Sequence, residues 1–161
     1  MRTVKNKQKG FSLIELLIVV AIILIIAAIA IPNLLRAKMA ANEASAVGSM
    51  RTINTTSVEY STTYGGYPPT LLALGGPAGG SATASSAELL DAVLAAGTKS
   101  GYVFAYTGGA TDTNGNILAY TLTATPTSVG VTGQRQFFTD QSGVIRANTT
   151  GAATINSTPL S

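Results

Sequence analysis

The sequence contains no cysteine and no histidine, and only 11% of its 161 residues are charged. Without cysteine the chain has no disulfide framework, and without histidine it has no imidazole for a zinc site or a Ser-His-Asp triad. Function classes that depend on those side chains are therefore excluded. We expect a protein that is not an enzyme, with no catalytic residues, no metal and no cofactor.

Positive charge is scarce beyond the first ten residues. The formal net charge of +3 comes from ten Lys and Arg against seven Asp and Glu. Four of these ten, Arg2, Lys5, Lys7 and Lys9, precede residue 11, which leaves six basic residues against seven acidic ones. The remainder of the chain is close to neutral and has no basic patch, so nucleic acid is not expected as a primary partner.

Residues 11–31 form an apolar run that is interrupted only by Ser12 and Glu15. Its length predicts one transmembrane helix, which needs about 20 apolar residues. Because four basic residues precede the run and only Arg36 and Lys38 follow closely, the N-terminus is predicted to face the cytoplasm. A carboxylate inside a bilayer costs roughly 2.5–3.5 kcal/mol, so Glu15 needs a partner or a purpose.

The helix is predicted to continue past Pro32 to about Tyr64. Apolar side chains from Leu35 to Tyr64 recur at spacings of three and four residues or their sums, which places them on one helical stripe, with Glu43 among the polar residues expected mostly off it. Pro32 removes one helical hydrogen bond and is the expected site of a kink. The glycine and proline pairs in residues 65–69 cannot continue a helix and should end it.

Residues 65–161 are predicted to form a globular head with a loop, a short helix and a sheet. The composition of residues 77–86 predicts a flexible surface loop, and residues 87–96 predict a short helix capped by Ser85 or Ser86 and ended by Gly97. Residues 149–161 are polar and are predicted to be a loose tail.

The head should also contain three or four antiparallel strands. Alternating apolar and polar residues, or short paired runs, occur in the segments 102–106, 118–123, 134–139 and 144–147. Residues 113–116 and 140–143 have the composition of hairpin turns, and Asn114-Gly115 predicts a type I′ turn. The fold class expected is α+β: a long N-terminal helix whose C-terminal half carries a small antiparallel sheet.

Two other patterns in the head have simple structural interpretations. The segment from Asp112 to Asn116 superficially resembles a calcium loop, but Ile117 and Thr123 stand where an EF-hand needs Gly and Glu. Asp140 before Ser-Gly is typical of a turn. Tyr60, Tyr64 and Tyr67 are expected to pack where the helix meets the sheet.

The segment KGFSLIELL at residues 9–17 resembles the processing site of type IV prepilins and of type II secretion pseudopilins. The resemblance covers the basic leader, Gly10, Phe11, Glu15, the apolar span and Pro32. It implies that residues 1–10 are a leader removed by a prepilin peptidase, which cuts between Gly10 and Phe11 and methylates the new amino group of Phe11. Glu15 would then pair with the Phe11 ammonium group of a neighbouring subunit and set the axial register of a filament.

Two features depart from the pattern of that family. Many pilins close a C-terminal loop with a cysteine pair, which this chain lacks. Many also have a glycine in the middle of the span, whereas residues 18–31 contain none, so any loosening of the helix there falls to Pro32.

The resemblance implies a pilin-like organisation with a leader, a span that forms the filament core, an amphipathic helical continuation and a head, at residues 1–10, 11–31, 32–64 and 65–161. We expect a structural subunit that forms a helical homo-oligomeric filament. Its expected partners are the prepilin peptidase, an inner-membrane assembly platform and the membrane itself, through residues 11–31. The chain would cross the bacterial inner membrane once before assembly and lie in an extracellular or periplasmic filament afterwards.

Other functions remain open from the sequence. The first is a pseudopilin of a type II secretion system, and the second is a signal-anchored surface protein that binds a ligand with its head. An ordinary secretory signal peptide with a cleavage site at Ala28-Ile29-Ala30 leaves the length of the apolar run and the position of Glu15 unexplained.

Overall fold

The computed structural model describes residues 10–76 and 81–160. The chain divides into two compact units, Met1–Ala37 and Lys38–Ser161. The first contains the beginning of the long helix, and the second contains the remainder of that helix together with the head. The predicted leader, residues 1–10, lies outside the described residues except for Gly10.

Helix α1 spans Leu13–Tyr64, 52 residues, with Pro32 inside it. Its end at Tyr64 confirms the predicted boundary: Gly65 adopts a φ of +84° and donates its N–H to the Ser61 carbonyl oxygen at 3.0 Å. A left-handed φ is accessible to glycine at little cost, so Gly65 ends the helix while it still satisfies a terminal carbonyl. Pro32 does not end the helix, and the kink expected there stays a prediction.

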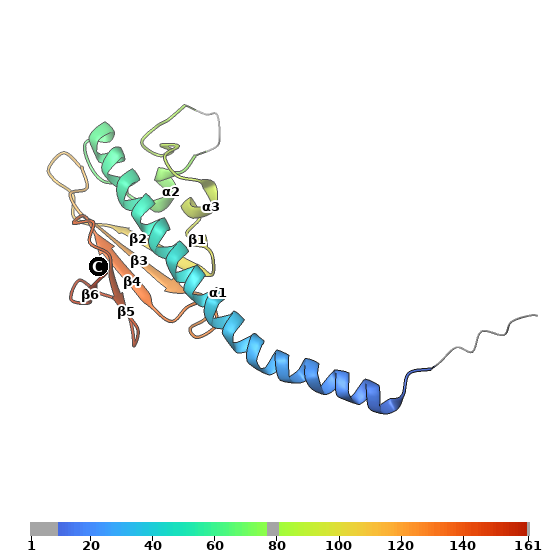
Figure 1. Cartoon of the computed structure of the whole chain (residues 1–161). Coiled ribbons are helices and arrows are strands. Elements are labelled where there is room, and N and C mark those ends of the chain that lie inside the picture. Colours follow the sequence, from blue (N-terminus) through green and yellow to red (C-terminus); the bar gives the residue numbers. More distant parts are fainter. Residues whose placement is uncertain (1–9, 77–80, 161) are drawn as a thin grey trace, which may run out of the picture. The chain divides into compact units, whose positions relative to one another are not determined.

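The described residues of the head form one antiparallel sheet of six strands, in the order β1-β2-β3-β4-β5-β6 (Figure 1). The strands are β1 (Thr98–Lys99), β2 (Tyr102–Gly108), β3 (Tyr120–Pro126), β4 (Gln136–Asp140), β5 (Arg146–Asn148) and β6 (Thr158–Pro159). The α+β, pilin-like fold class is therefore confirmed, but the expectation of three or four strands was too low. The two additional strands are two-residue edges that are too short to show any alternation of residue type.

The last strand corrects the prediction of a loose C-terminal tail. Residues Thr158 and Pro159 pair with β5, and the Leu160 N–H donates to the Ile145 carbonyl oxygen at 2.8 Å. The Arg146 guanidinium also donates to the Ser157 carbonyl oxygen at 3.2 Å. Backbone pairing, which depends little on side-chain type, holds this polar segment on the sheet.

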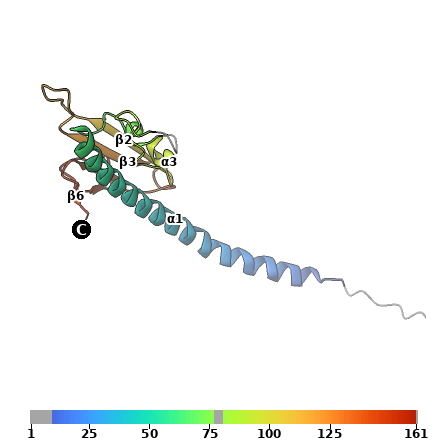
Figure 2. The ribbon, with the colours of Figure 1, turned by 90° about the horizontal axis from the view of Figure 1, so that it is seen from above.

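The core lies between the later part of α1 and one face of the sheet, as the two views show (Figure 2). Alternate residues of β2 and β3 point inward, so that Tyr102, Phe104, Leu122 and Ala124 are buried. From α1, the core receives four residues of the predicted stripe: Ala46, Met50, Ile53 and Tyr60. Leu35, at the start of the predicted stripe, is exposed.

Two short helices, α2 (Leu71–Leu74) and α3 (Ala92–Ala95), contact each other, and α3 contacts β1. The predicted helix at residues 87–96 is wrong in extent and in its cap. Asp91, not Ser85 or Ser86, caps α3 by accepting the Leu94 N–H at 2.9 Å. Residues Leu89 and Leu90 instead donate their N–H groups to the Leu74 carbonyl oxygen, so they satisfy the end of α2 rather than extend α3.

The end of the predicted short helix is confirmed, because Gly97 follows α3 with a φ of +80°. Of the predicted loop at residues 77–86, residues 77–80 lie outside the described residues. The rest includes a tight turn in which Thr83 and Ser86 exchange backbone hydrogen bonds of 2.9 and 3.0 Å.

The turn around Asn114 differs from the predicted type I′ conformation. Gly115 has a φ of +87°, but Asn114 does not have a positive φ, as a type I′ turn would require. The Asp112 carboxylate accepts hydrogen bonds from the backbone N–H groups of Asn114 and Asn116, both at 2.8 Å. This side chain, rather than two left-handed residues, therefore shapes the turn.

Gly133 is required for the close approach of the loop between β3 and β4 to Tyr102. A Cβ atom at this position would lie 2.7 Å from Tyr102 Cζ and 2.8 Å from Cε2. The ring cannot move aside easily, because it is fully buried and its hydroxyl donates to the Arg135 carbonyl oxygen at 2.8 Å.

We therefore expect Gly133→Ala to lower the free energy of unfolding by about 1–3 kcal/mol, the usual cost of overpacking. Chemical denaturation of the full chain in detergent micelles would measure it. Gly151→Ala is the matched control, since a Cβ at Gly151 meets nothing within 4 Å and should change stability by less than about 0.5 kcal/mol. Equal stability of the two variants would contradict the packing argument.

Candidate functional site

The candidate site is the start of α1. The residues predicted from the sequence, Gly10, Phe11 and Glu15, lie close together here, just before the helix and in its first turn. Gly10 and Phe11 precede the helix, and the Phe11 side chain is 86% exposed. A Cβ built on Gly10 would meet nothing within 4 Å. The bond between Gly10 and Phe11 therefore lies outside the helix in an exposed part of the described chain.

Glu15 makes a local contact that the sequence-based interpretation missed. Its Oε2 atom accepts the backbone N–H of Ser12 at 2.9 Å, and the Leu16 N–H donates to the Ser12 carbonyl oxygen at 3.2 Å. Ser12 and Glu15 have the spacing of the capping box S-x-x-E, in which the acidic side chain returns to the N-cap residue. That spacing is visible in the sequence and was a readable signal for this contact.

The cap also has an electrostatic consequence. The first four N–H groups of a helix lack helical partners, and the helix dipole places partial positive charge at that end. A carboxylate at Glu15 is favourable for both reasons. In the single chain, Glu15 thus has a role before any neighbouring subunit is considered, and its pairing with a Phe11 ammonium group stays a prediction.

Apolar side chains cover the rest of this unit on every side. The most apolar window of α1 has none of its residues buried, although it consists of large aliphatic side chains. Within residues 10–76 and 81–160, α1 is the one helix long and apolar enough to cross a membrane, judged by length and composition. A continuous exposed surface of this kind is a binding surface for lipid or for other apolar helices.

A second feature, where α1 packs against the head, was assigned wrongly from the sequence. Glu43 was expected mostly off the apolar stripe, yet it is only 7% exposed. Its Oε1 atom accepts the backbone N–H groups of Gln134 at 2.8 Å and Arg135 at 3.0 Å. Its Oε2 atom accepts Arg135 Nε at 2.7 Å, so one carboxylate joins α1 to the segment that leads into β4.

The ionisation of Glu43 reflects these contacts. Burial alone would raise its pKa, but the hydrogen bonds from Gln134 and Arg135 and the Arg135 charge outweigh burial and hold the pKa below its usual value. The signal was available in the sequence, because Glu43 lies seven residues before Met50, two helical turns along the same face. We call this arrangement the Glu43 clasp.

The candidate ligand residues of the head are occupied within turns. Asp140 accepts the Ser142 N–H at 2.9 Å, which confirms the predicted turn. Hydrogen bonds from Asn116 and Asn114 lower the pKa of Asp112. Among the residues that the structure describes, no group of three or more His, Cys, Asp or Glu side chains is arranged to hold a metal ion.

The apolar span with Glu15 at its start and the antiparallel sheet of the head together give an α+β, pilin-like architecture. Residues 5–31 match the family model described as the prokaryotic N-terminal methylation motif. A curated relative, the type IV wide pilus major component PilA4 of Thermus thermophilus, is 63% identical over 38 residues. Together the motif and this relative show that the N-terminal segment of the chain is similar to that of type IV prepilins.

The coverage of these matches is limited. The aligned segment spans 24% of this chain and only 29% of the length of the Thermus protein. No solved structure matches the chain. The comparisons therefore concern the N-terminal segment, and the head is described by its structure alone.

Proposed function

We propose that this chain is a structural subunit of a type IV pilus filament that is matured by a prepilin peptidase and polymerises through its N-terminal helix. The observation that carries the proposal is the methylation motif at residues 5–31, with Glu15 at the start of a helix whose most apolar window has no buried residue. The motif and the pilin relative support a pilin-type function. The relative is named as a pilus component, which favours a pilus over a secretion pseudopilin.

In this proposal the leader determines topology and its removal permits assembly. Arg2, Lys5, Lys7 and Lys9 hold the N-terminus on the cytoplasmic side of the inner membrane. Cleavage after Gly10 removes all four charges and creates the amino group of Phe11, which the peptidase methylates. The partners are then the assembly platform, the membrane and other copies of the chain, and no catalytic step is assigned to the chain itself.

Cleavage can be tested by intact-protein mass spectrometry of the full chain, expressed with and without a prepilin peptidase. We expect the peptidase to remove residues 1–10 and to add one methyl group to Phe11. A Gly10→Val variant should remain almost entirely uncut, because a branched side chain replaces the hydrogen at the cleavage position. Gly48→Ala is the glycine control and should be cut normally, because a Cβ there meets nothing within 4 Å.

The proposal would be wrong if the wild-type chain kept its first ten residues in cells with an active peptidase. A cut after Ala30 would identify an ordinary secretory signal peptide. The chain would be a pseudopilin instead if it were cleaved normally and its deletion abolished the secretion of exoproteins but left pili intact.

A further inference from the structure

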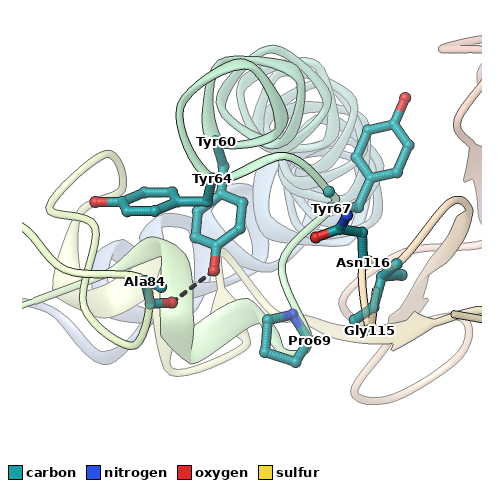
Figure 3. Close-up of a pocket in the computed structure, with 9 residues that line it drawn as sticks. Tyr60, Tyr64, Tyr67, Pro69, Ala84, Gly115 and Asn116 are labelled. Atoms are coloured by element: carbon teal, nitrogen blue, oxygen red, sulfur yellow. Dashed lines mark hydrogen bonds between the residues drawn. The ribbon is translucent and has the colours of Figure 1, made fainter. Parts of the chain in front are cut away.

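The head has a pocket of about 190 Å³ at the C-terminal end of α1, which we call the tyrosine pocket (Figure 3). Tyr60 and Tyr64 line it from α1, with the Tyr60 ring directed toward Ala84 and the Tyr64 ring directed away from Asn116, and Gly115 and Asn116 of the hairpin between β2 and β3 line it on the other side. Pro69 lines its lower edge in this view. The pocket therefore joins three segments that are far apart in the sequence.

Two aromatic rings form one wall of the tyrosine pocket. The centroids of Tyr60 and Tyr64 are 4.6 Å apart and their planes are tilted by 42°. Tyr60 is fixed, because it is 4% exposed and its hydroxyl donates to the Ala84 carbonyl oxygen at 2.6 Å. Tyr64 is partly exposed and presents its ring beside this fixed neighbour. The ring of Tyr67 turns away and packs edge-on against Tyr120, with centroids 4.9 Å apart.

The pocket also has free hydrogen-bonding atoms at its rim. The Tyr64 hydroxyl has no hydrogen-bond partner among the described residues, so it can donate and accept. Asn116 is oriented by its Nδ2 atom, which donates to Asp112 Oδ2 at 3.1 Å. This contact leaves the Asn116 amide oxygen as an acceptor. Two of the residues that line the pocket, Tyr64 and Asn116, thus have polar atoms that can bond to a ligand.

The third determinant is charge. None of the residues that line the pocket is ionisable as Asp, Glu, Lys or Arg. The nearest acidic side chain in the hairpin, Asp112, is already saturated by hydrogen bonds from Asn114 and Asn116. A phosphate or a carboxylate group would enter without a counter-charge and close to Asp112, whose lowered pKa keeps it ionised, which is unfavourable. The ligand that fits therefore carries no negative charge.

The loop that forms the pocket floor is set by Gly66. A Cβ atom there would lie 2.8 Å from the Ile117 nitrogen and 3.1 Å from its carbonyl oxygen. Only glycine lets residues 65–67 approach the hairpin, where the Tyr67 N–H donates to the Ile117 carbonyl oxygen at 2.8 Å. The pocket is thus built on backbone contacts and exists before a ligand arrives.

We propose that the tyrosine pocket binds one ring of a neutral carbohydrate. A pyranose has apolar C–H faces that match an aromatic wall, and a rim of hydroxyl groups that both donate and accept. The small volume suits a single ring rather than a drug-sized ligand, whose pockets usually exceed about 300 Å³. This inference goes beyond the filament function and does not depend on it.

The test is saturation-transfer difference NMR on the full chain in zwitterionic micelles whose detergent carries no sugar. The probes are methyl β-glucoside and methyl N-acetyl-β-glucosaminide, with glucuronate as the charged comparison. We expect transfer to both neutral sugars, with a dissociation constant on the order of 1 mM from the ligand-efficiency bound, and at least 10-fold weaker binding of glucuronate.

Variants at Tyr64 distinguish a built site from weak surface contact. Tyr64→Ala removes the ring and should weaken binding at least 10-fold, whereas Tyr64→Phe keeps it and should stay within about 3-fold of the wild type. Thr63→Ala, an exposed neighbour outside the pocket, should bind normally. Circular dichroism of each variant verifies that the head has folded.

Three outcomes would overturn the proposal. The first is no transfer from the wild-type chain to either neutral sugar. The second is equal binding by the wild type and a folded Tyr64→Ala variant. The third is self-association of the chain that Tyr64→Ala abolishes and the sugars do not compete with, which would assign the pocket to a second copy.

Discussion

Glu15→Ala should produce a chain that inserts into the membrane and is processed, but that enters filaments at least about 100-fold less than the wild type. In the proposed filament the Glu15 carboxylate faces the Phe11 ammonium group of a neighbouring subunit among apolar helices. Removing one partner leaves a buried charge uncompensated, which costs about 3–5 kcal/mol, and every 1.4 kcal/mol is a factor of ten. Quantifying sheared filaments against the membrane pool would measure this loss.

The helix cap makes a control necessary, because Glu15→Ala also removes the 2.9 Å hydrogen bond from the Ser12 N–H. Glu15→Gln separates the two roles: its amide oxygen can still accept that hydrogen bond, but it carries no charge. If pairing with the Phe11 amine governs assembly, the Gln variant should fail like the Ala variant. Wild-type assembly by Glu15→Gln would mean that the cap is sufficient and would refute the charge-pairing role.

The helical part of the fold could be predicted well because its signals are long or chemically strong. The apolar run and the stripe through Met50 and Ile53 repeat over many turns, and the Gly65-Gly66 pair marks the end of α1. The strands β2 and β3 were also visible, since Tyr102, Phe104 and Leu122 alternate with smaller or polar residues. Periodicity of this kind can be read from the sequence without any knowledge of tertiary contacts.

The short elements could not be predicted from periodicity. Strands β1 and β6 have two residues each, and α3 has four, so none contains a full repeat. Their positions depend on tertiary pairing, as when Leu89 and Leu90 satisfy the Leu74 carbonyl instead of extending a helix. Local propensity in residues 87–96 favoured a helix, and the packing against α2 overrode it.

The functional features also divide into those that the sequence predicts and those that it does not. Glu15 and Phe11 were found because a carboxylate in an apolar run conflicts with a bilayer, and such a conflict is readable without a structure. The tyrosine pocket was not predicted from the sequence. Packing of Tyr60, Tyr64 and Tyr67 where the helix meets the sheet was expected and is confirmed, but Asn116 on the other side of the pocket lies 52 residues beyond Tyr64. No local pattern joins the two walls.

Glu43→Ala should be among the most destabilising single changes in the unit Lys38–Ser161, lowering the free energy of unfolding by about 2–4 kcal/mol. The variant loses three hydrogen bonds to a charged group and leaves the Gln134 and Arg135 N–H groups without their acceptor. Arg135 also lies 5.5 Å from the Phe137 ring, so its displacement disturbs a buried aromatic residue. Chemical denaturation of the full chain in detergent micelles measures the effect.

Glu59→Ala is the matched control, because Glu59 lies on the same helix and is exposed, and its change should stay within about 0.5 kcal/mol. If both variants lost the same stability, the clasp would contribute nothing beyond helix propensity. Glu43→Gln should lose less than Glu43→Ala, since its amide oxygen can still accept backbone hydrogen bonds at Oε1. The part of the clasp's stabilisation that depends on charge is the difference in free energy of unfolding between the wild type and Glu43→Gln.

The difference in free energy of unfolding between the wild type and Glu43→Gln should decrease as the pH falls. The pKa of Glu43 is lowered in the folded chain, so the native state binds its proton less readily than the unfolded state does. The resulting stability is complete above the unfolded pKa of about 4.3 and is lost as the pH falls through the lower folded pKa. The wild type should therefore exceed Glu43→Gln most at pH 7 and approach it toward pH 3. Asp91 and Asp112, whose pKa values are also lowered, titrate in both proteins and cancel in the comparison. A difference that stayed constant from pH 7 to pH 3 would show that the clasp stabilises by shape and hydrogen bonding rather than by charge.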